Sequence, residues 1–400
     1  MLKGKKILIG VCGGIAAYKI CELVRELQRE NATVRTVLTP GATQFISPLT
    51  FESLTGVPAP VDLFKPFLSE IEHIELATWP DLYVIAPATA TSIAKFASGI
   101  ADNLVTATFL ATRKDVLIIP AMNTGMWENP ATQKNVSLLR KRHISVVEPE
   151  YGLMASQLEG KGVGRLPDQP IIVSHIYRKL WQKKELAGVN VTITAGCTRE
   201  KIDPVRFISN QSSGKMGFAL AEVAAAMGAN ITLIHGPTHL KPPTDVNIVA
   251  VETANEMFLA TKDNYPTNGI LIGAAAVSDF RPDVISEKKI KKENAASVIP
   301  LKQNPDILFE LKELRKQSVH IGFALETNDE IAYAAKKIAS KGLDFIVVNN
   351  PSEKGAGFSV NTNKAKILFP DGTIVDLPLM KKIELAVEIL KKAMIIHANL

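Results

Sequence analysis

The chain has 400 residues, of which 46% are apolar, and a formal net charge of +6. This length fits two ordinary domains with full cores, and the modest charge permits an anionic ligand without arguing for nucleic acid. No apolar run approaches the roughly 18 residues of a membrane span. The first apolar run breaks at GVCGG and no A-x-A cleavage site follows, so we expect a cytoplasmic chain without a membrane partner. Cys12, Cys21 and Cys197 are scattered and odd in number, which argues against a disulfide framework or a zinc site.

Strands and helices alternate along the first half. KILIGV (6–11) is a short apolar run, and after Gly13 and Gly14 the spacing of Ile15, Tyr18, Leu23 and Leu27 predicts a helix over 15–30. TVRTVLT, LYVIAPA, VLIIPA and HISVVEP predict further strands. This alternation is typical of a parallel sheet covered by helices, which binds its ligands at the carboxyl ends of the strands.

The same plan restarts after a polar, helix-like segment at 177–188. VNVTITAG (189–196) predicts a new first strand, AKILFPDGTIVDL predicts a hairpin, and a last helix is expected from about Leu379. We therefore predict an α/β chain of two doubly wound, Rossmann-like domains with mainly parallel sheets. The predicted domains are residues 1–185 and 186–400.

Polar groups follow several of the predicted strands of the first half. Gly13 and Gly14 are compatible with a phosphate or flavin turn, or with a plain tight turn. The hydroxyl residues of PATATS (87–92) could bind a phosphate, although ordinary N-capping needs only one of them. Asn123 in PAMNTGMW could present its amide to a carboxylate. His73 lies on a probable helix, where a lone histidine is more often structural than catalytic.

These segments, in order and spacing, resemble the flavin-dependent cysteine decarboxylases over about residues 5–175: GVCGGIAAYK, EHIELATWPDLYVIAPATATSIAKFASGIADNL and PAMNTGMW. The resemblance implies a flavodoxin-like, FMN-binding domain in which His73 acts as a base and Asn123 holds the substrate carboxylate. Oxidation of the thiol-bearing carbon would supply the electron sink for loss of CO2, and the product would then take back a proton. By resemblance, the residues that contact FMN are Gly13, Gly14, Ile15, Thr39, Thr89, Ala90, Thr91, Ser92 and Ala121.

The stretch YGLMASQLEGKGVGR (151–165) is rich in glycine, which suits a mobile flap over a ligand. The resemblance identifies it as the substrate clamp of the decarboxylases, whose cysteine donates the final proton. Here that catalytic position is Ser156, and a hydroxyl is a far weaker acid than a thiol with its pKa of about 8.5. Either Glu159 or a bound water replaces the thiol, or the decarboxylase half is impaired.

The second half carries a possible phosphate seat. Ser212, Ser213 and Gly214 open a predicted helix, with several basic and amide residues nearby. The run EKKIKKEN (287–294) alone is typical of a solvated face. Lysines on separate loops nevertheless fit a triphosphate, which needs several cations and backbone donors.

TREKIDPVRFISNQSSGKMG, AAAVSDFRP, KKIKK, NPDI and GFALET resemble the phosphopantothenate–cysteine ligases across about residues 189–385. The resemblance implies CTP-dependent condensation of 4′-phosphopantothenate with cysteine through an acyl-cytidylate, with Mg2+ on the triphosphate. Arg206 would bind the substrate phosphate, and Asn210 would bind substrate and help turn over the intermediate. Lys289 would bind the phosphates as a catalytic residue. The residues implied in CTP binding are Ser212, Gly214, Ala274, Ala275, Ala276, Val277, Asp279, Lys289, Asn304, Pro305, Asp306, Ile307, Phe323, Lys337 and Lys341.

The two halves in this order resemble the bifunctional coenzyme A biosynthesis enzymes of bacteria. These enzymes decarboxylate the ligase product, phosphopantothenoylcysteine, to 4′-phosphopantetheine. The resemblance also implies homo-oligomers, with trimers of the decarboxylase half and dimers of the ligase half. Three alternatives stay open: a decarboxylase of peptide C-terminal cysteines, a non-catalytic regulatory subunit, and an NAD(P) oxidoreductase. The absence of G-x-G-x-x-G disfavours the last.

Overall fold

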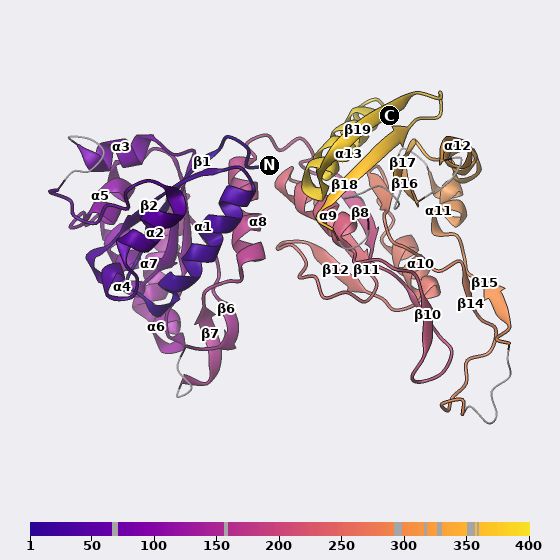
Figure 1. Ribbon diagram of the computed structural model, residues 1–400, viewed down its shortest axis with the longest axis horizontal. Coiled ribbons are helices and arrows are strands. Elements are labelled where there is room, and N and C mark those ends of the chain that lie inside the picture. Colours follow the sequence, from indigo (N-terminus) through magenta and orange to yellow (C-terminus); the bar gives the residue numbers. More distant parts are fainter. Residues whose placement is uncertain are drawn as a thin grey trace. The chain divides into compact units, whose positions relative to one another are not determined.

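The structure, a computed structural model, describes residues 1–65, 71–155, 159–291, 298–315, 318–325, 330–349, 357 and 360–400. The chain divides into two compact units, Met1–Gln182 and Lys183–Leu400, whose elements are labelled in Figure 1. Each unit is built around its own sheet. No helix of the described ranges is long and apolar enough to cross a membrane.

The sheet of the first unit has five parallel strands in the order β2-β1-β3-β4-β5. Its strands are short apolar runs that are buried almost throughout, as expected of a parallel sheet with helices on its faces. This strand order is the flavodoxin-like one, and it places the ligand-binding edge at the carboxyl ends of the strands. The strands are β1 (Lys6–Val11), β2 (Thr33–Leu38), β3 (Leu82–Ala88), β4 (Asp115–Pro120) and β5 (Ser145–Val146).

The helices of this unit are α1 (Ile20–Arg29), α2 (Pro48–Thr55), α3 (Glu72–Thr78), α4 (Ala90–Ser98), α5 (Leu104–Ala111), α6 (Thr124–Glu128), α7 (Pro130–Lys141) and α8 (Gln169–Leu180), with 3-10 turns η1 (Ile15–Lys19) and η2 (Pro40–Gln44). The prediction of one apolar helix face over 15–30 is wrong at its start. Ile15 and Tyr18 are more than half exposed, because η1 has three residues per turn and aligns both on its outer side. The buried face belongs to α1 alone and consists of Ile20, Leu23, Val24 and Leu27.

The segment at 177–188 also differs from its prediction. Helix α8 begins earlier, after Asp168 and with Pro170 in its first turn, and ends at Leu180. It buries Ile172, Ile176 and Tyr177, so its apolar side belongs to the first core. The antiparallel pair β6 (Glu150–Leu153) and β7 (Lys161–Arg165) precedes it.

The main sheet of the second unit has eight strands in the order β12-β11-β8-β13-β16-β17-β18-β19. The first six are parallel and the last two pair antiparallel, which confirms the prediction of mainly parallel sheets. The strands are β8 (Asn190–Ala195), β11 (Asn230–His235), β12 (Asn247–Ala250), β13 (Ile270–Gly273), β16 (Val319–Leu325), β17 (Phe345–Asn349), β18 (Thr362–Leu368) and β19 (Ile374–Lys381).

Two small antiparallel pairs and five described helices complete this unit. The pairs are β9 (Arg199–Lys201) with β10 (Phe207–Ser209) and β14 (Phe280–Pro282) with β15 (Leu301–Gln303). The last helix begins three residues later than expected, because β19 continues to Lys381. The helices are α9 (Lys215–Ala226), α10 (Ala254–Asp263), α11 (Ile307–Glu310), α12 (Glu330–Lys341) and α13 (Lys382–Ala398), with a 3-10 turn η5 (Lys312–Leu314).

Candidate active sites

The carboxyl ends of four neighbouring strands in the first unit carry the residues expected at a flavin site. Gly13 follows β1, Thr39 follows β2, Thr89 follows β3 and Ala121 follows β4. Because these strands are parallel neighbours, the residues share one edge of the sheet. Gly13 passes so close to the next loop that a Cβ atom there would lie 2.6 Å from the carbonyl carbon of Gly41. The edge therefore has a tightly packed backbone floor.

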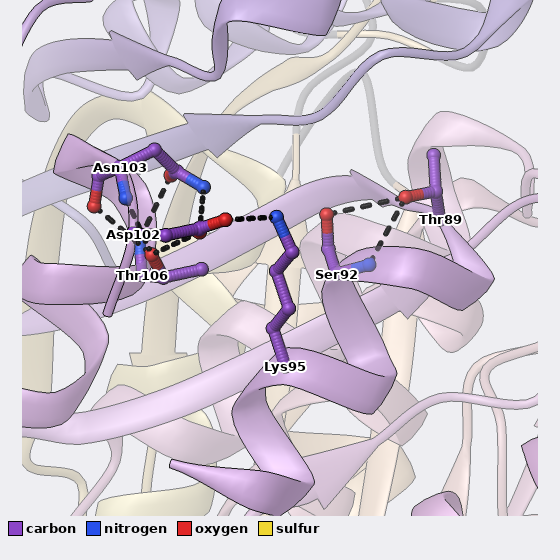
Figure 2. Close-up of polar contacts among 6 residues, drawn as sticks. All are labelled: Thr89, Ser92, Lys95, Asp102, Asn103 and Thr106. Atoms are coloured by element: carbon purple, nitrogen blue, oxygen red, sulfur yellow. Dashed lines mark hydrogen bonds and ion pairs between the residues drawn. The ribbon is translucent and has the colours of Figure 1, made fainter. Parts of the chain in front are cut away.

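Hydroxyl groups line the start of α4 at this edge. Thr89 is the N-cap: its Oγ1 accepts from the backbone N–H of Ser92 at 3.3 Å and donates to Ser92 Oγ at 3.1 Å (Figure 2). Ser92 is buried, whereas Thr91 is exposed. Burial raises the pKa of the adjacent Cys12 to about 11, so that thiol stays protonated at neutral pH. Helix capping explains the hydroxyl of Thr89, and Thr91 and Ser92 follow it in the first turn of α4.

The far end of α4 is tied to the start of α5. Lys95 Nζ lies 2.5 Å from Asp102 Oδ2, and Asp102 Oδ1 accepts from the side-chain amide of Asn103 at 2.9 Å (Figure 2). Asn103 caps α5 through the backbone N–H of Thr106. This network fixes the loop between the two helices.

Asn123 is the N-cap of the short helix α6. Its Oδ1 accepts from the backbone N–H of Gly125 at 2.8 Å. Because the oxygen is used in the cap, the side-chain NH2 is the group left to meet a ligand; it has no protein partner in the described chain. An amide held this way is a donor, which is what a carboxylate requires.

The β6–β7 hairpin packs against the loop that carries Asn123. The N–H of Met122 donates to the carbonyl of Gly164 at 2.9 Å. A Cβ atom at Gly164 would overlap the carbonyl oxygen of Met122, and one at Gly162 would overlap the hydroxyl of Thr124. These glycines therefore serve close packing rather than the mobility suggested by the sequence. Ser156, the clamp position implied by the resemblance, lies outside the described residues.

His73 is not brought to this site within one chain. It lies in the first turn of α3, which packs against α5. In Figure 1, α3 lies at one end of the first unit and α6 with the β6–β7 hairpin at the other. The residues at the sheet edge fit a flavin, since they offer a glycine floor, a helix N-terminus and buried hydroxyls, but the expected base lies elsewhere on the same chain.

A cavity of about 740 Å3 lies at the carboxyl ends of the strands in the second unit. Every residue that the family resemblance implied in CTP binding lines this cavity, except Lys289, and Asn210 lines it too. These lining residues are Ser212, Gly214, Ala274, Ala275, Ala276, Val277, Asp279, Asn304, Pro305, Asp306, Ile307, Phe323, Lys337 and Lys341.

Hydrogen bonds between separate loops hold the floor of the cavity. The N–H of Ala276 donates to Gly196 O at 2.8 Å, which joins the segment after β13 to the end of β8. Asn210 Nδ2 donates to Val277 O at 2.9 Å, and the N–H of Asn304 donates to Asp279 O at 2.8 Å. The polar groups on this floor are therefore positioned before any ligand binds.

Several cations face the cavity. Lys341 Nζ lies 2.9 Å from Asp306 Oδ2, and Asp306 also caps α11. Sequence reasoning missed Lys215 and Lys382, which line the same cavity as the first residues of α9 and α13. Lys215 stands inside the motif SSGKMG and could have been found there. Lys382 lies far from every motif, and only the fold reveals it.

Arg206 and Lys289 do not line the cavity. Arg206 is bound by Asp203, whose carboxylate accepts from the guanidinium Nε at 3.0 Å and from the N–H of Ile290 at 3.2 Å. Arg206 Nη2 also donates to Ile290 O at 3.0 Å. The turn at 203–206 thus holds the segment next to Lys289, whose side chain is exposed. No cluster of three metal-binding side chains is found in the described ranges.

Comparison with known proteins agrees with this division. Residues 1–181 match the family model described as "Flavoprotein", and residues 186–396 match "DNA/pantothenate metabolism flavoprotein C-terminal domain". The chain is thus a flavoprotein with a second α/β domain that is itself typical of pantothenate metabolism.

The bifunctional coenzyme A biosynthesis protein CoaBC of Bacillus subtilis is 42% identical over 98% of this chain and 97% of its own. The CoaBC protein of Escherichia coli K12 is 42% identical over 95% of this chain and 94% of its own. A solved C-terminal domain of CoaBC is 40% identical and covers 54% of this chain and 100% of its own, with a TM-score of 0.47. The chain belongs to the family of bifunctional coenzyme A biosynthesis proteins. It is a bifunctional enzyme with a decarboxylase and a ligase activity.

Proposed function

We propose that the second unit condenses 4′-phosphopantothenate with cysteine at the expense of CTP, and that the first unit decarboxylates the product to 4′-phosphopantetheine with FMN. One observation carries the ligase assignment: nearly all the residues implied in CTP binding line a single cavity. Full-length similarity to bifunctional relatives does not favour the peptide decarboxylase, the regulatory subunit or the dehydrogenase.

In the ligase unit, the segment Ala274–Val277 and the loop at Asn304 would seat the nucleotide, and Lys337 and Lys341 would meet its phosphates. Transfer of cytidylate to the substrate carboxylate releases pyrophosphate and makes the carbonyl open to attack by the cysteine amine. Asp279 would help to seat the nucleotide, and Mg2+ would neutralise its triphosphate. Asn210, whose side-chain amide donates to Val277 O, would act on the acyl-cytidylate.

Pyrophosphate release tests this assignment. With phosphopantothenate and cysteine present, the protein should release pyrophosphate from CTP in an amount equal to the sum of phosphopantothenoylcysteine and its decarboxylation product. Pyrophosphate release without cysteine, in stoichiometric amounts only, would report the acyl-cytidylate. No release with any nucleoside triphosphate would exclude the ligase mechanism.

In the decarboxylase unit, FMN bound at the sheet edge would supply the electron sink for loss of CO2. Asn123 would donate its side-chain N–H to the substrate carboxylate, and the β6–β7 hairpin would exclude water from the bound substrate. His73 would act as the base. Since α3 and α6 lie at different ends of one unit, we propose that a second copy of the chain supplies His73 to the site, as a homo-oligomer would permit.

Ser156 favours a second candidate, in which the ligase is active and the decarboxylase is impaired. The final proton would otherwise come from Glu159, which is exposed, or from water. Stopped-flow absorbance with phosphopantothenoylcysteine separates these cases. Flavin that stays reduced would establish the impairment, and normal turnover of a Glu159→Gln variant would exclude the glutamate as the acid.

A further inference from the structure

Helix α3, which carries His73, depends on its neighbours for its position. It has seven residues and follows Ile71, whose apolar side chain cannot cap a helix. So short a helix is marginal on its own, because few hydrogen bonds offset the ordering of its backbone. It packs against α5, whose start is fixed by the network in Figure 2, and Thr112 at the end of α5 donates to Ala77 O at 2.8 Å. The place of His73 therefore depends on how α3 is held.

Arg35 contacts this helix from the sheet. It lies on β2, at the edge of the five-stranded sheet, and its Nη1 donates to Glu75 Oε1 at 2.7 Å. Its guanidinium carbon lies 4.4 Å from the centre of the Trp79 ring. Glu75 and Trp79 are four residues apart, so both side chains face the same side of α3. One guanidinium thus meets the helix at two points, one turn apart.

These two contacts are stronger and more directional than an ordinary surface ion pair. The side chains of Arg35 and Glu75 are only 20% and 31% exposed, so solvent screens their attraction less. A guanidinium is planar, donates in fixed directions and stacks on an aromatic ring. The apolar packing of Leu76 and Ala77 is non-directional, so it does not by itself fix the rotation of α3. Arg35 supplies the contact that does.

We propose that Arg35 is a positioning residue of the decarboxylase: through Glu75 and Trp79 it sets the rotation of α3, and so the direction in which His73 points. This inference rests on the proposed role of His73 as the base, and it extends that role to a residue outside every motif of the sequence. A base must lie within hydrogen-bond reach of the proton that it removes. Loss of Arg35 should therefore slow the chemical step without weakening the binding of FMN.

Arg35→Met removes the charge and keeps a long apolar side chain. Stopped-flow absorbance gives the rate of flavin reduction by phosphopantothenoylcysteine in the full-length protein, a step that precedes the final proton transfer at the clamp. We expect this rate to fall about tenfold or more, with little change in the half-saturating substrate concentration or in the dissociation constant of FMN. Arg35→Lys keeps the charge without the planar guanidinium and should recover part of the rate. Arg29→Met, whose exposed partner Glu26 lies on α1, is the matched control and should keep the natural rate.

A second substitution separates the positioning of His73 from a general loss of structure. If Arg35 acts through His73, Arg35→Met should slow flavin reduction in the natural background and have no further effect on the slower rate of His73→Gln. The same loss in both backgrounds, or no loss in the natural one, would overturn the inference. Thermal unfolding shows whether each variant folds.

Hydrogen exchange of the backbone amides of α3 gives a readout that does not depend on activity. We expect faster exchange over Glu72–Thr78 in Arg35→Met and not in Arg29→Met, and unchanged exchange would overturn the inference. If the natural protein does not reduce its flavin with this substrate, the decarboxylase assignment fails, and the exchange result alone decides whether Arg35 holds α3. If His73→Gln reduces flavin at the natural rate, the base is wrongly assigned and the role of Arg35 falls with it. A slow His73→Gln beside a normal Arg35→Met would keep the base and exclude Arg35.

Discussion

The N–H of Met122 donates to the carbonyl of Gly164 at 2.9 Å, and this bond joins the β6–β7 hairpin to the residue that precedes Asn123. Gly164 has φ +149°, and a Cβ atom there would overlap the carbonyl of Met122. A Gly164→Ala substitution must therefore push the hairpin away from the Asn123 loop. Strain of this kind costs on the order of 1–3 kcal/mol.

We expect Gly164→Ala to lower decarboxylase turnover at least about tenfold, since displacement of positioning groups has large effects on rate. The ligase activity of the same protein should be unchanged. Gly152→Ala is the control from the same hairpin, because a Cβ there meets only the flexible side chain of Arg165. Equal decarboxylase activity in the two variants would contradict the positioning role of Gly164.

Asn123→Asp tests the amide as a donor. Aspartate caps a helix as well as asparagine does, so α6 should keep its stability. The new carboxylate would repel a substrate carboxylate instead of donating to it, and we expect kcat/KM of the decarboxylase to fall about a hundredfold or more. Asn129→Asp changes the equivalent N-cap of α7 and should have no such effect. Unaltered decarboxylation by Asn123→Asp would exclude the carboxylate contact.

Ser156→Cys restores the acid of the family clamp. If the hydroxyl limits the final proton transfer, the thiol should speed the return of the flavin absorbance to its oxidised level, because its pKa of about 8.5 allows proton donation near neutrality. Single-turnover stopped-flow measurements give this rate directly. An unchanged rate would mean that another acid already serves the natural protein.

Asp203 holds the guanidinium of Arg206, which we propose binds the substrate phosphate. The Arg206 guanidinium, and then the N–H groups of Val205, Arg206 and Ile290, hold the pKa of its carboxyl well below the usual range. We expect Asp203→Asn to raise KM for phosphopantothenate about tenfold, because Arg206 loses its carboxylate partner, and to change KM for CTP less, because Arg206 does not line the nucleotide cavity. Asp283→Asn, on an exposed ion pair with Lys302, is the control. Equal changes in both KM values would contradict this role.

His320 on β16 makes the second unit sensitive to acid. It is fully buried, its Nε2 lies 2.7 Å from Tyr265 Oη, and burial followed by the charge of Arg315 lowers its pKa to about 4. The unfolded value is about 6.5, so stability is complete above pH 6.5 and falls as the pH drops toward 4. The loss between pH 7 and pH 5 should be about 2 kcal/mol.

Urea unfolding followed by far-UV circular dichroism measures this loss. Trp79, Trp127 and Trp181 all lie in the first unit, so tryptophan fluorescence reports that unit separately. Burial raises the pKa of Asp344, and this shift makes the second unit more stable as the pH falls. The pH dependence must therefore be compared with that of His320→Gln, which keeps Asp344. The loss of unfolding free energy of the second unit between pH 7 and pH 5 should be smaller in His320→Gln. Equal pH dependence would exclude His320 as its source.

The strands were predictable because each is a continuous apolar run, and the motif loops were predictable because they follow those strands. Contacts between distant segments were not. Nothing in the sequence indicates that Gly164 touches Met122, and the apolar spacing at Ile15 and Tyr18 gave the wrong buried face because the first turn is a 3-10 turn. Lys382 escaped notice because it lies outside every motif and joins the cavity lining only through the fold.

The ligase cavity takes its walls from Thr194 near the start of the second unit and from Lys382 in its last helix. On the ribosome, the elements of the flavoprotein unit are all synthesised once Leu180 is reached, and domains fold as units in the order of synthesis. The ligase site, in contrast, gains its final wall only when α13 emerges. A chain released before α13 is complete would therefore have the flavin site but would lack the last wall of the nucleotide cavity.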